Sequence, residues 1–330
     1  MTLKLAFTGT GYIANIHAAA AQKVAGVGLT AVSNHHPTSR QTFAETFNIP
    51  RQYDNVADLL ADGDVDAISI NTPNALHAPE AIAALEAGVH VLVEKPMAMN
   101  AAEAKAMIAA SQRSGTLLMV AHCWRFDEEV LWLKQQMEPL GAIIRTKGYG
   151  VHVNWGPGGW FTQAALAGGG ALADMGIHAI DTARFLLGDP LPQSVFARIG
   201  TYYGDYDVDD TGTIVVTWDN GCTSTIESGW WQPYAGGPEA STELYGRFGF
   251  GSLFPTRVQV GEETAVNPNF PHPRPIHCPQ TMYDAQLAYF IACIRAGQQP
   301  TPGGHEGLIN MKIVDAAYES SRTGQTIMIR

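Results

Sequence analysis

A lysine stands where open α/β sheets place their ligands. Glu94-Lys95-Pro96 directly follows Val89–Val93, a short apolar run that predicts a buried strand. Such sheets bind ligands at the carboxyl ends of their strands, so Lys95 could hydrogen-bond a substrate hydroxyl and lower its pKa. The alternative interpretation is an exposed lysine at a strand end.

A carboxylate and an imidazole are spaced to share one face of a helix. Asp174 and His178 lie four residues apart within Ala171–Leu187, which predicts a helix directly after three glycines. The pair suits metal ligation, or an acid–base site in which the carboxylate orients its partner. It equally suits a capping aspartate and a core histidine. No other His/Cys group has convincing metal-ligand spacing, so we expect no metal.

A glycine motif opens the chain. Gly9-Thr10-Gly11-Tyr12-Ile13-Ala14 follows the predicted strand Leu3–Thr8 and begins an Ala-rich predicted helix. In this context Gly9 permits a tight turn, Gly11 lets backbone amides approach a pyrophosphate, and Ala14 lets helix and strand pack closely. The motif therefore predicts dinucleotide binding, against the alternative of a plain glycine turn.

The elements around these segments predict two domains. Over residues 1–122, short apolar strands without polar alternation alternate with helices, which is typical of a doubly wound parallel sheet. The predicted strands are Leu3–Thr8, Leu29–Ser33, Ala67–Asn71, Val89–Val93 and Leu117–Ala121.

Over residues 123–330 the pattern changes to hairpin signals. Thr211–Trp218 and Cys222–Ser228 flank Asp219-Asn220-Gly221, where Asn-Gly favours a tight hairpin turn. We expect an α+β domain with a mostly antiparallel sheet, and two closing helices at Met282–Arg295 and Glu306–Ser321.

Composition restricts the class of protein. The 330 residues are 46% hydrophobic and 15% charged, which excludes wholesale disorder. A net charge of −11 disfavours nucleic acid as a partner. We expect neither a signal peptide nor a membrane-spanning helix, and four scattered cysteines fit a reducing cytoplasm.

Taken together, these segments resemble the Gfo/Idh/MocA family of NAD(P)-dependent oxidoreductases. The resemblance covers the whole chain: the motif at Gly9, the turn at Thr72-Pro73-Asn74 with His77, the EKP at Glu94, the GGGALAD segment with His178, and the closing Arg322-Thr-Gly-Gln. It implies a Rossmann domain followed by a domain whose large open antiparallel sheet carries the substrate site and often the subunit interface.

The resemblance also implies roles for residues. Lys95, Asp174 and His178 are the implied catalytic positions, with a sugar, sugar derivative or polyol as substrate. Hydride goes to the nicotinamide while His178 serves as acid/base, Lys95 stabilises alkoxide character, and Asp174 orients substrate or base. The expected cofactor contacts are Gly9, Thr10, Gly11, Tyr12, Ile13, Ser33, Asn34, His35, Arg40, Thr72, Pro73, Asn74, His77, Glu94, Lys95 and Pro96.

Substrate recognition leaves alternatives open. Beside the three catalytic positions, Arg125 just past the last parallel strand is an expected substrate contact. Trp155 and Trp160 flank a glycine-rich loop and either place an indole against a sugar ring or pack under the loop.

Cofactor choice is predicted at the end of the second strand. An NAD-specific domain usually carries Asp or Glu there, whereas this chain has Asn34. Ser33, His35 and Arg40 could serve a 2′-phosphate, so we expect NADP(H) to be modestly favoured, with use of NAD(H) or of both as the alternative.

Two other functions fit the same motifs, and the second domain predicts an oligomer. The rivals are a dinucleotide-binding sensor or co-regulator without catalysis, and an enzyme of retro-aldol or glycoside cleavage that uses NAD transiently. The second-domain sheet has too few predicted helices to cover both faces, so we expect a homodimer or homotetramer through it, with Trp218, Ile226 and Trp230 as candidates for burial.

Overall fold

The computed structural model describes residues 2–153, 156–231, 239–271 and 278–329. The chain forms two compact units. The first unit contains Met1–Cys123 and Pro279–Leu308, and the second contains Trp124–Cys278 and Ile309–Arg330. The segment from Pro279 thus returns to the first unit, a feature that the sequence patterns did not indicate.

The first unit is built on a six-stranded parallel sheet. Its strands run in the order β3-β2-β1-β4-β5-β6, and every neighbouring pair is parallel. The predicted doubly wound sheet is therefore confirmed. The strands are β1 (Leu3–Thr8), β2 (Val27–Ser33), β3 (Arg51–Tyr53), β4 (Ala67–Ile70), β5 (His90–Glu94) and β6 (Leu118–Ala121).

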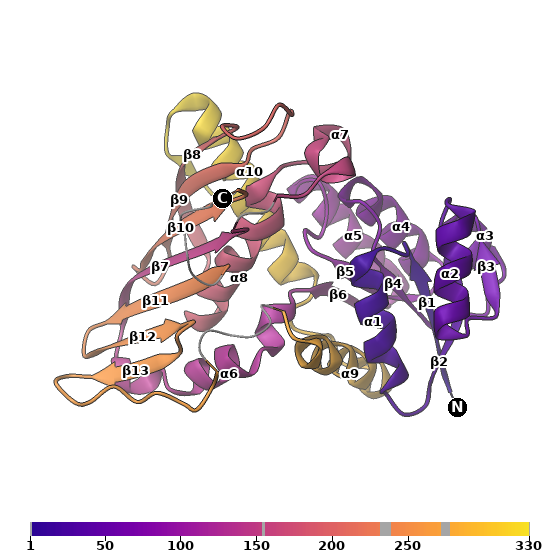
Figure 1. Cartoon of the computed structure of the whole chain (residues 1–330), viewed down its shortest axis with the longest axis horizontal. Coiled ribbons are helices and arrows are strands. Elements are labelled where there is room, and N and C mark those ends of the chain that lie inside the picture. The colour runs from indigo at the N-terminus through magenta and orange to yellow at the C-terminus, as the bar shows by residue number, and fades with distance from the viewer. Residues whose placement is uncertain (1, 154–155, 232–238, 272–277, 330) are drawn as a thin grey trace. The chain divides into compact units, whose positions relative to one another are not determined.

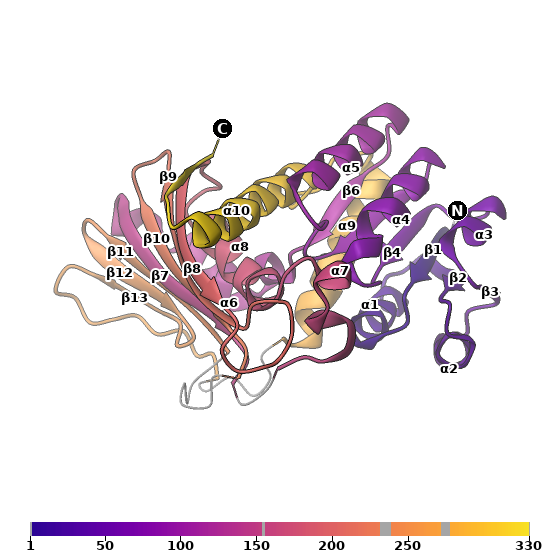
Figure 2. The same ribbon diagram turned by 90° about the horizontal axis from the view of Figure 1, so that it is seen from above.

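Helices cover both faces of this sheet (Figure 2). On one side lie α1 (Tyr12–Gln22), α2 (Pro37–Phe47) and α9 (Gln280–Ala296), and on the other α3 (Val56–Ala61), α4 (Asn74–Glu86) and α5 (Ala101–Ser114). Double coverage explains why β4 and β6 are buried along their whole length. Strand β3 and helix α3 are very short, so the sequence patterns predicted neither of them.

The second unit is built on an eight-stranded sheet (Figure 1). The order is β13-β12-β11-β7-β10-β9-β8-β14, and only β7 and β10 pair in parallel, which confirms the mostly antiparallel sheet. The β9–β10 hairpin is also confirmed, with Gly221 at φ +84°. The strands are β7 (Ile143–Val151), β8 (Pro192–Gly200), β9 (Thr211–Trp218), β10 (Thr223–Gly229), β11 (Ala240–Gly246), β12 (Gly249–Leu253), β13 (Arg257–Val260) and β14 (Ile327–Met328).

The helical segments of the second unit are mostly short. They are α6 (Glu128–Gln135), α7 (Ala164–Ala167), the π-helix η4 (Leu172–Gly176), α8 (Ile177–Leu186) and the 3₁₀ turns η1 (Cys123–Phe126), η2 (Glu138–Leu140) and η3 (Gly159–Thr162). The last helix, α10 (Gly304–Thr323), begins in the first unit and continues into the second.

One face of the eight-stranded sheet is covered within the chain. Helix α8 contacts β7, β10 and β11, and α10 receives hydrogen bonds from β8 through Ser320 and Ser321. Trp218, Ile226 and Trp230 are fully buried in the chain's own interior. The predicted burial of these three residues is therefore confirmed, and alternation turns them toward the helices of the same chain rather than toward the uncovered face of the sheet.

The opposite face of that sheet carries no helix among the described residues (Figure 2). It presents threonines, charged side chains and half-buried aromatics, among them Lys147, Tyr149, Thr213, Glu227 and Tyr245. In the described part of the chain, no helix is long and apolar enough to cross a membrane.

Candidate functional site

The turn after β1 has the backbone that the glycine motif predicts. Gly9 has φ +79°, and a Cβ there would come within 2.5 Å of the Asn71 carbonyl oxygen, so only glycine fits. Gly11 precedes α1, and a Cβ there would meet no atom within 4 Å. The helix N-terminus therefore opens onto free space in which an anionic group can reach the amides.

The end of β2 is occupied by an internal hydrogen-bond network. The Asn34 amide donates to Thr10 Oγ1 and accepts from the His36 N–H at 2.9 Å, while Thr10 Oγ1 lies 2.6 Å from Ser39 Oγ. Arg40 donates to the Asn34 carbonyl at 2.6 Å and pairs with Asp54. These groups hold the β2 end close to the glycine turn.

The other predicted contacts of this region differ in exposure. Tyr12 and His35 are exposed, and the His35 ring lies against the His36 ring with centroids 3.8 Å apart and planes tilted by 43°. Ser33 is buried, and its hydroxyl has no hydrogen-bond partner among the described residues. Tyr12 and His35 thus face solvent, whereas Ser33 at the end of β2 does not.

A half-buried carboxyl group lies beneath the next strand end. Thr8 Oγ1 and Thr72 Oγ1 donate to Glu80 Oε2 at 3.0 and 2.9 Å. Burial raises the pKa of Glu80 to about 7, against the effect of both hydroxyl donors. Thr8 directly precedes Gly9, so this carboxyl supports the two backbone segments that meet there.

His77 joins two turns. Its Nδ1 lies 2.8 Å from the Pro96 carbonyl oxygen and its Nε2 lies 2.8 Å from the Thr72 carbonyl oxygen. The ring is 1% exposed, and burial lowers its pKa although both carbonyl contacts oppose this. The expected cofactor contact of His77 is thus accompanied by a structural one, which fastens the EKP turn to the turn after β4.

Glu94 faces inward from the EKP turn. Its Oε2 accepts the Lys95 N–H at 3.1 Å, and its Oε1 lies 3.3 Å from Nε2 of the buried His17 on α1. Burial raises the pKa of Glu94, but the hydrogen bond and charge of His17 and the charge of Lys95 hold it below its usual value. The Glu94 side chain therefore holds the backbone of Lys95 in place through this hydrogen bond.

In the second unit, two of the three glycines before the π-helix lie so close to neighbouring groups that a side chain would not fit. A Cβ on Gly170 would lie 1.8 Å from the Asp209 carbonyl oxygen, and one on Gly169 would lie 2.1 Å from the Tyr318 hydroxyl. The Asp209 carboxylate accepts the N–H groups of Gly170 and Leu172 at 2.7 and 2.8 Å. Asp209 thus binds the N-terminal N–H groups of the helical segment that carries Asp174 and His178.

Asp174 lies on the π-helix, in a polar cluster that the sequence analysis did not identify. Trp230 Nε1 donates to its Oδ2 at 3.1 Å, and His152 Nε2 lies 3.6 Å from the same oxygen. His152 Nδ1 lies 3.1 Å from Glu239 Oε1. Burial lowers the pKa of His152, but its two carboxylate partners outweigh burial and raise it, which favours an imidazolium between two carboxylates.

His178 follows one turn later, on α8. It is 8% exposed, and its ring stacks on Trp124 with centroids 5.1 Å apart and planes at 23°. The predicted helix exists, although its first turn is a π-helix. Gly150 permits this placement, because a Cβ there would lie 2.3 Å from the Met175 carbonyl oxygen.

Arg125 is not available as a predicted substrate contact. Its guanidinium donates to Asp181 at 2.8 Å through two nitrogens and to Asp189 at 2.7 and 3.1 Å, and the residue is 4% exposed. We therefore correct its role to a buried ion-pair centre. Trp160 is half-buried and stacks on Phe161 at 3.8 Å, and Trp155 lies outside the described residues.

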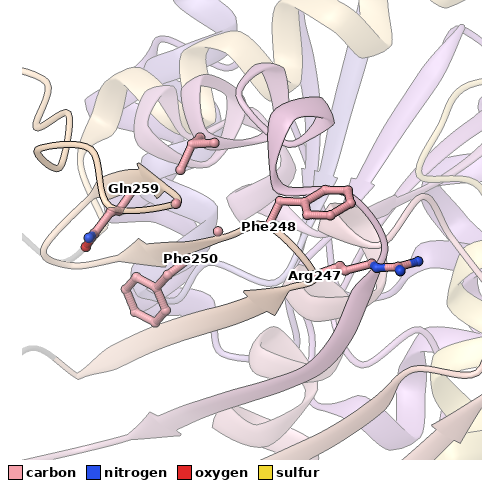
Figure 3. A pocket seen from close by; sticks show the side chains of 7 residues that line it. Arg247, Phe248, Phe250 and Gln259 are labelled. Atoms are coloured by element: carbon pink, nitrogen blue, oxygen red, sulfur yellow. The ribbon is translucent and has the colours of Figure 1, made fainter.

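A separate hollow lies beside strands β12 and β13 of the second unit. Figure 3 shows Arg247, Phe248, Phe250 and Gln259 around it, and none of the predicted site residues lines it. Across the described ranges, no group of three or more His, Cys, Asp or Glu side chains is arranged to hold a metal ion.

Comparisons with known proteins agree with this architecture. Three family models match successive parts of the chain: the oxidoreductase family's NAD-binding Rossmann fold over residues 3–122, a Gfo/Idh/MocA C-terminal domain over 138–250, and the family's C-terminal alpha/beta domain over 257–329.

Individual relatives align over most of their length. A 1,5-anhydro-D-fructose reductase of Ensifer adhaerens is 28% identical over 87% of this chain and 86% of its own. A D-xylose 1-dehydrogenase (NADP(+)) of Haloferax volcanii is 28% identical over 90% of each chain. The solved aldose-aldose oxidoreductase of Caulobacter crescentus, complexed with glycerol, superposes over the full length of both chains with a TM-score of 0.87 and 28% identity. The chain therefore belongs to the Gfo/Idh/MocA family of oxidoreductases.

Proposed function

We propose that this chain is an NAD(P)-dependent oxidoreductase that transfers a hydride between the nicotinamide and a CH–OH or carbonyl carbon of a sugar, sugar derivative or polyol. The observation that carries the proposal is the anchored pair of the second unit, in which Trp230 fixes the Asp174 carboxylate and His178 follows on the same helical segment. Relatives named as sugar reductases and dehydrogenases support the substrate class.

The first unit fits a dinucleotide. Gly9 has to be glycine because of its backbone and its neighbour, and the space in front of Gly11 leaves α1 amides accessible. We assign Gly9, Thr10 and Gly11 to the pyrophosphate and Thr72, Pro73 and Lys95 to the nicotinamide half. When bound, the nicotinamide supplies the hydride acceptor or donor.

The chain's own residues supply the proton chemistry. His178 takes the hydroxyl proton during oxidation and returns it during reduction, because an imidazole titrates near neutral pH. The Lys95 ammonium stabilises negative charge on the reacting oxygen. Asp174 holds substrate or base in orientation, with its own position fixed by Trp230 and with His152 beside it.

The cluster around Asp174 is suited to a polyhydroxylated substrate. The carboxylates of Asp174 and Glu239 are suited to accept hydrogen bonds from substrate hydroxyl groups, and His152 lies between them with Nε2 toward Asp174 and Nδ1 toward Glu239. We add His152 and Glu239 to the candidate substrate-binding residues, in place of Arg125.

For the cofactor, we propose that NADP(H) is accepted and modestly favoured. Asn34 carries no negative charge to repel a 2′-phosphate. Thr10 hydrogen-bonds both Asn34 and the Ser39 hydroxyl, so that hydroxyl lies close to Asn34. Arg40 is neutralised by Asp54, which keeps the expected preference small.

We further propose a homodimer or homotetramer through the second-unit sheet. In the described part of the chain, its outer face carries half-buried Tyr149, Tyr245 and Phe250 and no covering helix. Light scattering tests this, since a mass of 35.4 kDa at micromolar concentration contradicts it.

The proposed activity is tested by a substrate screen. Absorbance at 340 nm is followed with both nicotinamide cofactors against aldoses, ketoses, inositols, 1,5-anhydro sugars and sugar acids. Turnover of a neutral sugar or polyol supports the proposal. Tight dinucleotide binding without turnover of any compound favours the sensor, and product formation without net absorbance change favours transient use of NAD.

A further inference from the structure

Two buried histidines hold the turn that carries Lys95. His77 contacts the Pro96 carbonyl oxygen on the far side of the turn, at 2.8 Å. His17 contacts Glu94 on the near side, at 3.3 Å. The proposed function gives no role to His17, although it is 1% exposed and lies on the helix that begins at the glycine motif.

Glu94 connects His17 to the backbone of Lys95. It is 7% exposed, and its two carboxylate oxygens have different partners: Oε2 accepts the Lys95 N–H at 3.1 Å, and Oε1 faces His17 Nε2. Within the described residues Oε1 has no polar partner other than His17 Nε2, so its charge depends on the imidazole beside it. A buried carboxylate that loses its partner is drawn to the nearest remaining cation.

His17 is itself fixed from two other elements. Its Nδ1 lies 3.0 Å from Ser69 Oγ on β4, and its ring lies 5.8 Å from the Tyr283 ring on α9. Gln286 on α9 approaches Nε2 at 3.4 Å. Because strand and helices hold the ring on different sides, its Nε2 is directed at Glu94 and cannot turn away without breaking these contacts.

The charged and titratable groups around Glu94 determine which cation its carboxylate pairs with. His17 faces it from α1, His77 contributes from α4, and Lys95 follows it in the chain; the charges of all three lower the pKa of Glu94. From α9, Tyr283 and Gln286 contribute no charge. Lys95 is thus the cation that competes with His17 for the Glu94 carboxylate.

We propose that His17 is a positioning residue for Lys95. By pairing with Glu94, it leaves the carboxylate free to fix the Lys95 N–H while keeping the Lys95 ammonium from being drawn back onto it. The inference rests on the proposed function only in that Lys95 must act on the reacting oxygen; the competition between His17 and Lys95 for Glu94 stands without it.

Three variants separate positioning from a merely structural contribution. In His17→Gln, Glu94 retains its charge, so we expect Lys95 to pair with it and kcat to fall at least tenfold. In Glu94→Gln, an amide oxygen still accepts the Lys95 N–H but no charge attracts the ammonium. The double variant places two complementary amides together, so we expect it to recover most of the kcat lost in His17→Gln.

The test that needs no substrate is competitive acylation of the full-length chain between pH 7 and 11, read by peptide mass spectrometry. We expect the Lys95 titration midpoint to rise in His17→Gln and fall in Glu94→Gln, with a several-fold change in labelling at fixed pH. Exposed Lys105 on α5 serves as the internal control and stays unchanged. This readout separates a failure of the inference from a failure of the proposed activity.

Two results overturn the inference: a Lys95 midpoint that does not move in either single variant, and a double variant whose kcat is no higher than that of His17→Gln. Circular dichroism and dinucleotide affinity are measured alongside. If His17→Gln fails to fold, Glu94→Gln alone decides, because an unchanged Lys95 midpoint there excludes the charge competition.

Discussion

Glu80 makes the stability of the first unit depend on pH in an unusual direction. Its carboxyl group accepts hydrogen bonds from Thr8 and Thr72, and no basic side chain among the described residues forms an ion pair with it. Burial raises its pKa from 4.5 to about 7. The folded chain therefore holds this proton more tightly than the unfolded chain does.

The sign follows from linkage. Glu80 contributes its full stabilisation below about pH 4.5, where both states are protonated, and loses it as the pH rises to about 7. Each pKa step corresponds to about 1.4 kcal/mol, so ionisation of Glu80 costs the fold about 3 kcal/mol at pH 8. Glu80→Gln retains an oxygen for the two threonines and cannot ionise.

We expect the free energy of unfolding of Glu80→Gln, relative to the wild type, to increase by about 2.5 kcal/mol between pH 5 and pH 8, because a small part of the loss has already occurred at pH 5. Urea unfolding followed by far-UV circular dichroism at four pH values measures this. The matched control is Glu86→Gln on the same helix, an exposed residue paired with Arg113, whose difference should stay nearly flat. A Glu80→Gln difference that is constant, or that shrinks toward pH 8, refutes the reasoning.

Three further substitutions test other parts of the account. Asn34→Asp should weaken NADP(H) binding at least tenfold, about 1.4 kcal/mol, and spare NAD(H); fluorescence titration of both cofactors checks this, and an unchanged ratio means that the 2′ position is recognised elsewhere. Arg125→Met leaves the buried carboxylate of Asp181 without its ion-pair partner and should lower the free energy of unfolding by about 3–5 kcal/mol, measured by urea titration, whereas a loss below 1 kcal/mol contradicts the buried ion pair. Gly170→Ala places a Cβ 1.8 Å from the Asp209 carbonyl oxygen and should abolish turnover while dinucleotide affinity stays normal; wild-type activity would show that this approach is not required.

The sequence patterns predicted those features that short segments determine. Gly9 is an example, because its turn, the strand before it and the helix after it lie within about twenty residues. The same holds for the β9–β10 hairpin, whose Asn-Gly turn fixes both strands. Alternation and turn chemistry act locally, so one segment is enough to recognise them.

Partners distant in sequence could not be predicted from such segments. Arg125 was placed at the substrate because of its position after the last parallel strand, yet its carboxylate partners lie 56 and 64 residues further along. His152 gave no signal, because its neighbours Asp174 and Glu239 come from other elements. The return of α9 to the first unit, which brings Tyr283 to His17, is likewise a tertiary contact.

The assignment of Lys95 and His178 as catalytic residues is tested most directly by stopped-flow measurement of hydride transfer at 340 nm. The wild type is compared with Lys95→Met and His178→Asn, using the sugar turned over best in the screen and Lys105→Met as control. We expect both variants to lower the rate by about 100-fold or more, with dinucleotide affinity within about threefold of the wild type. Near-normal rates in either variant, or a loss of rate fully explained by lost dinucleotide binding, would contradict the assignment.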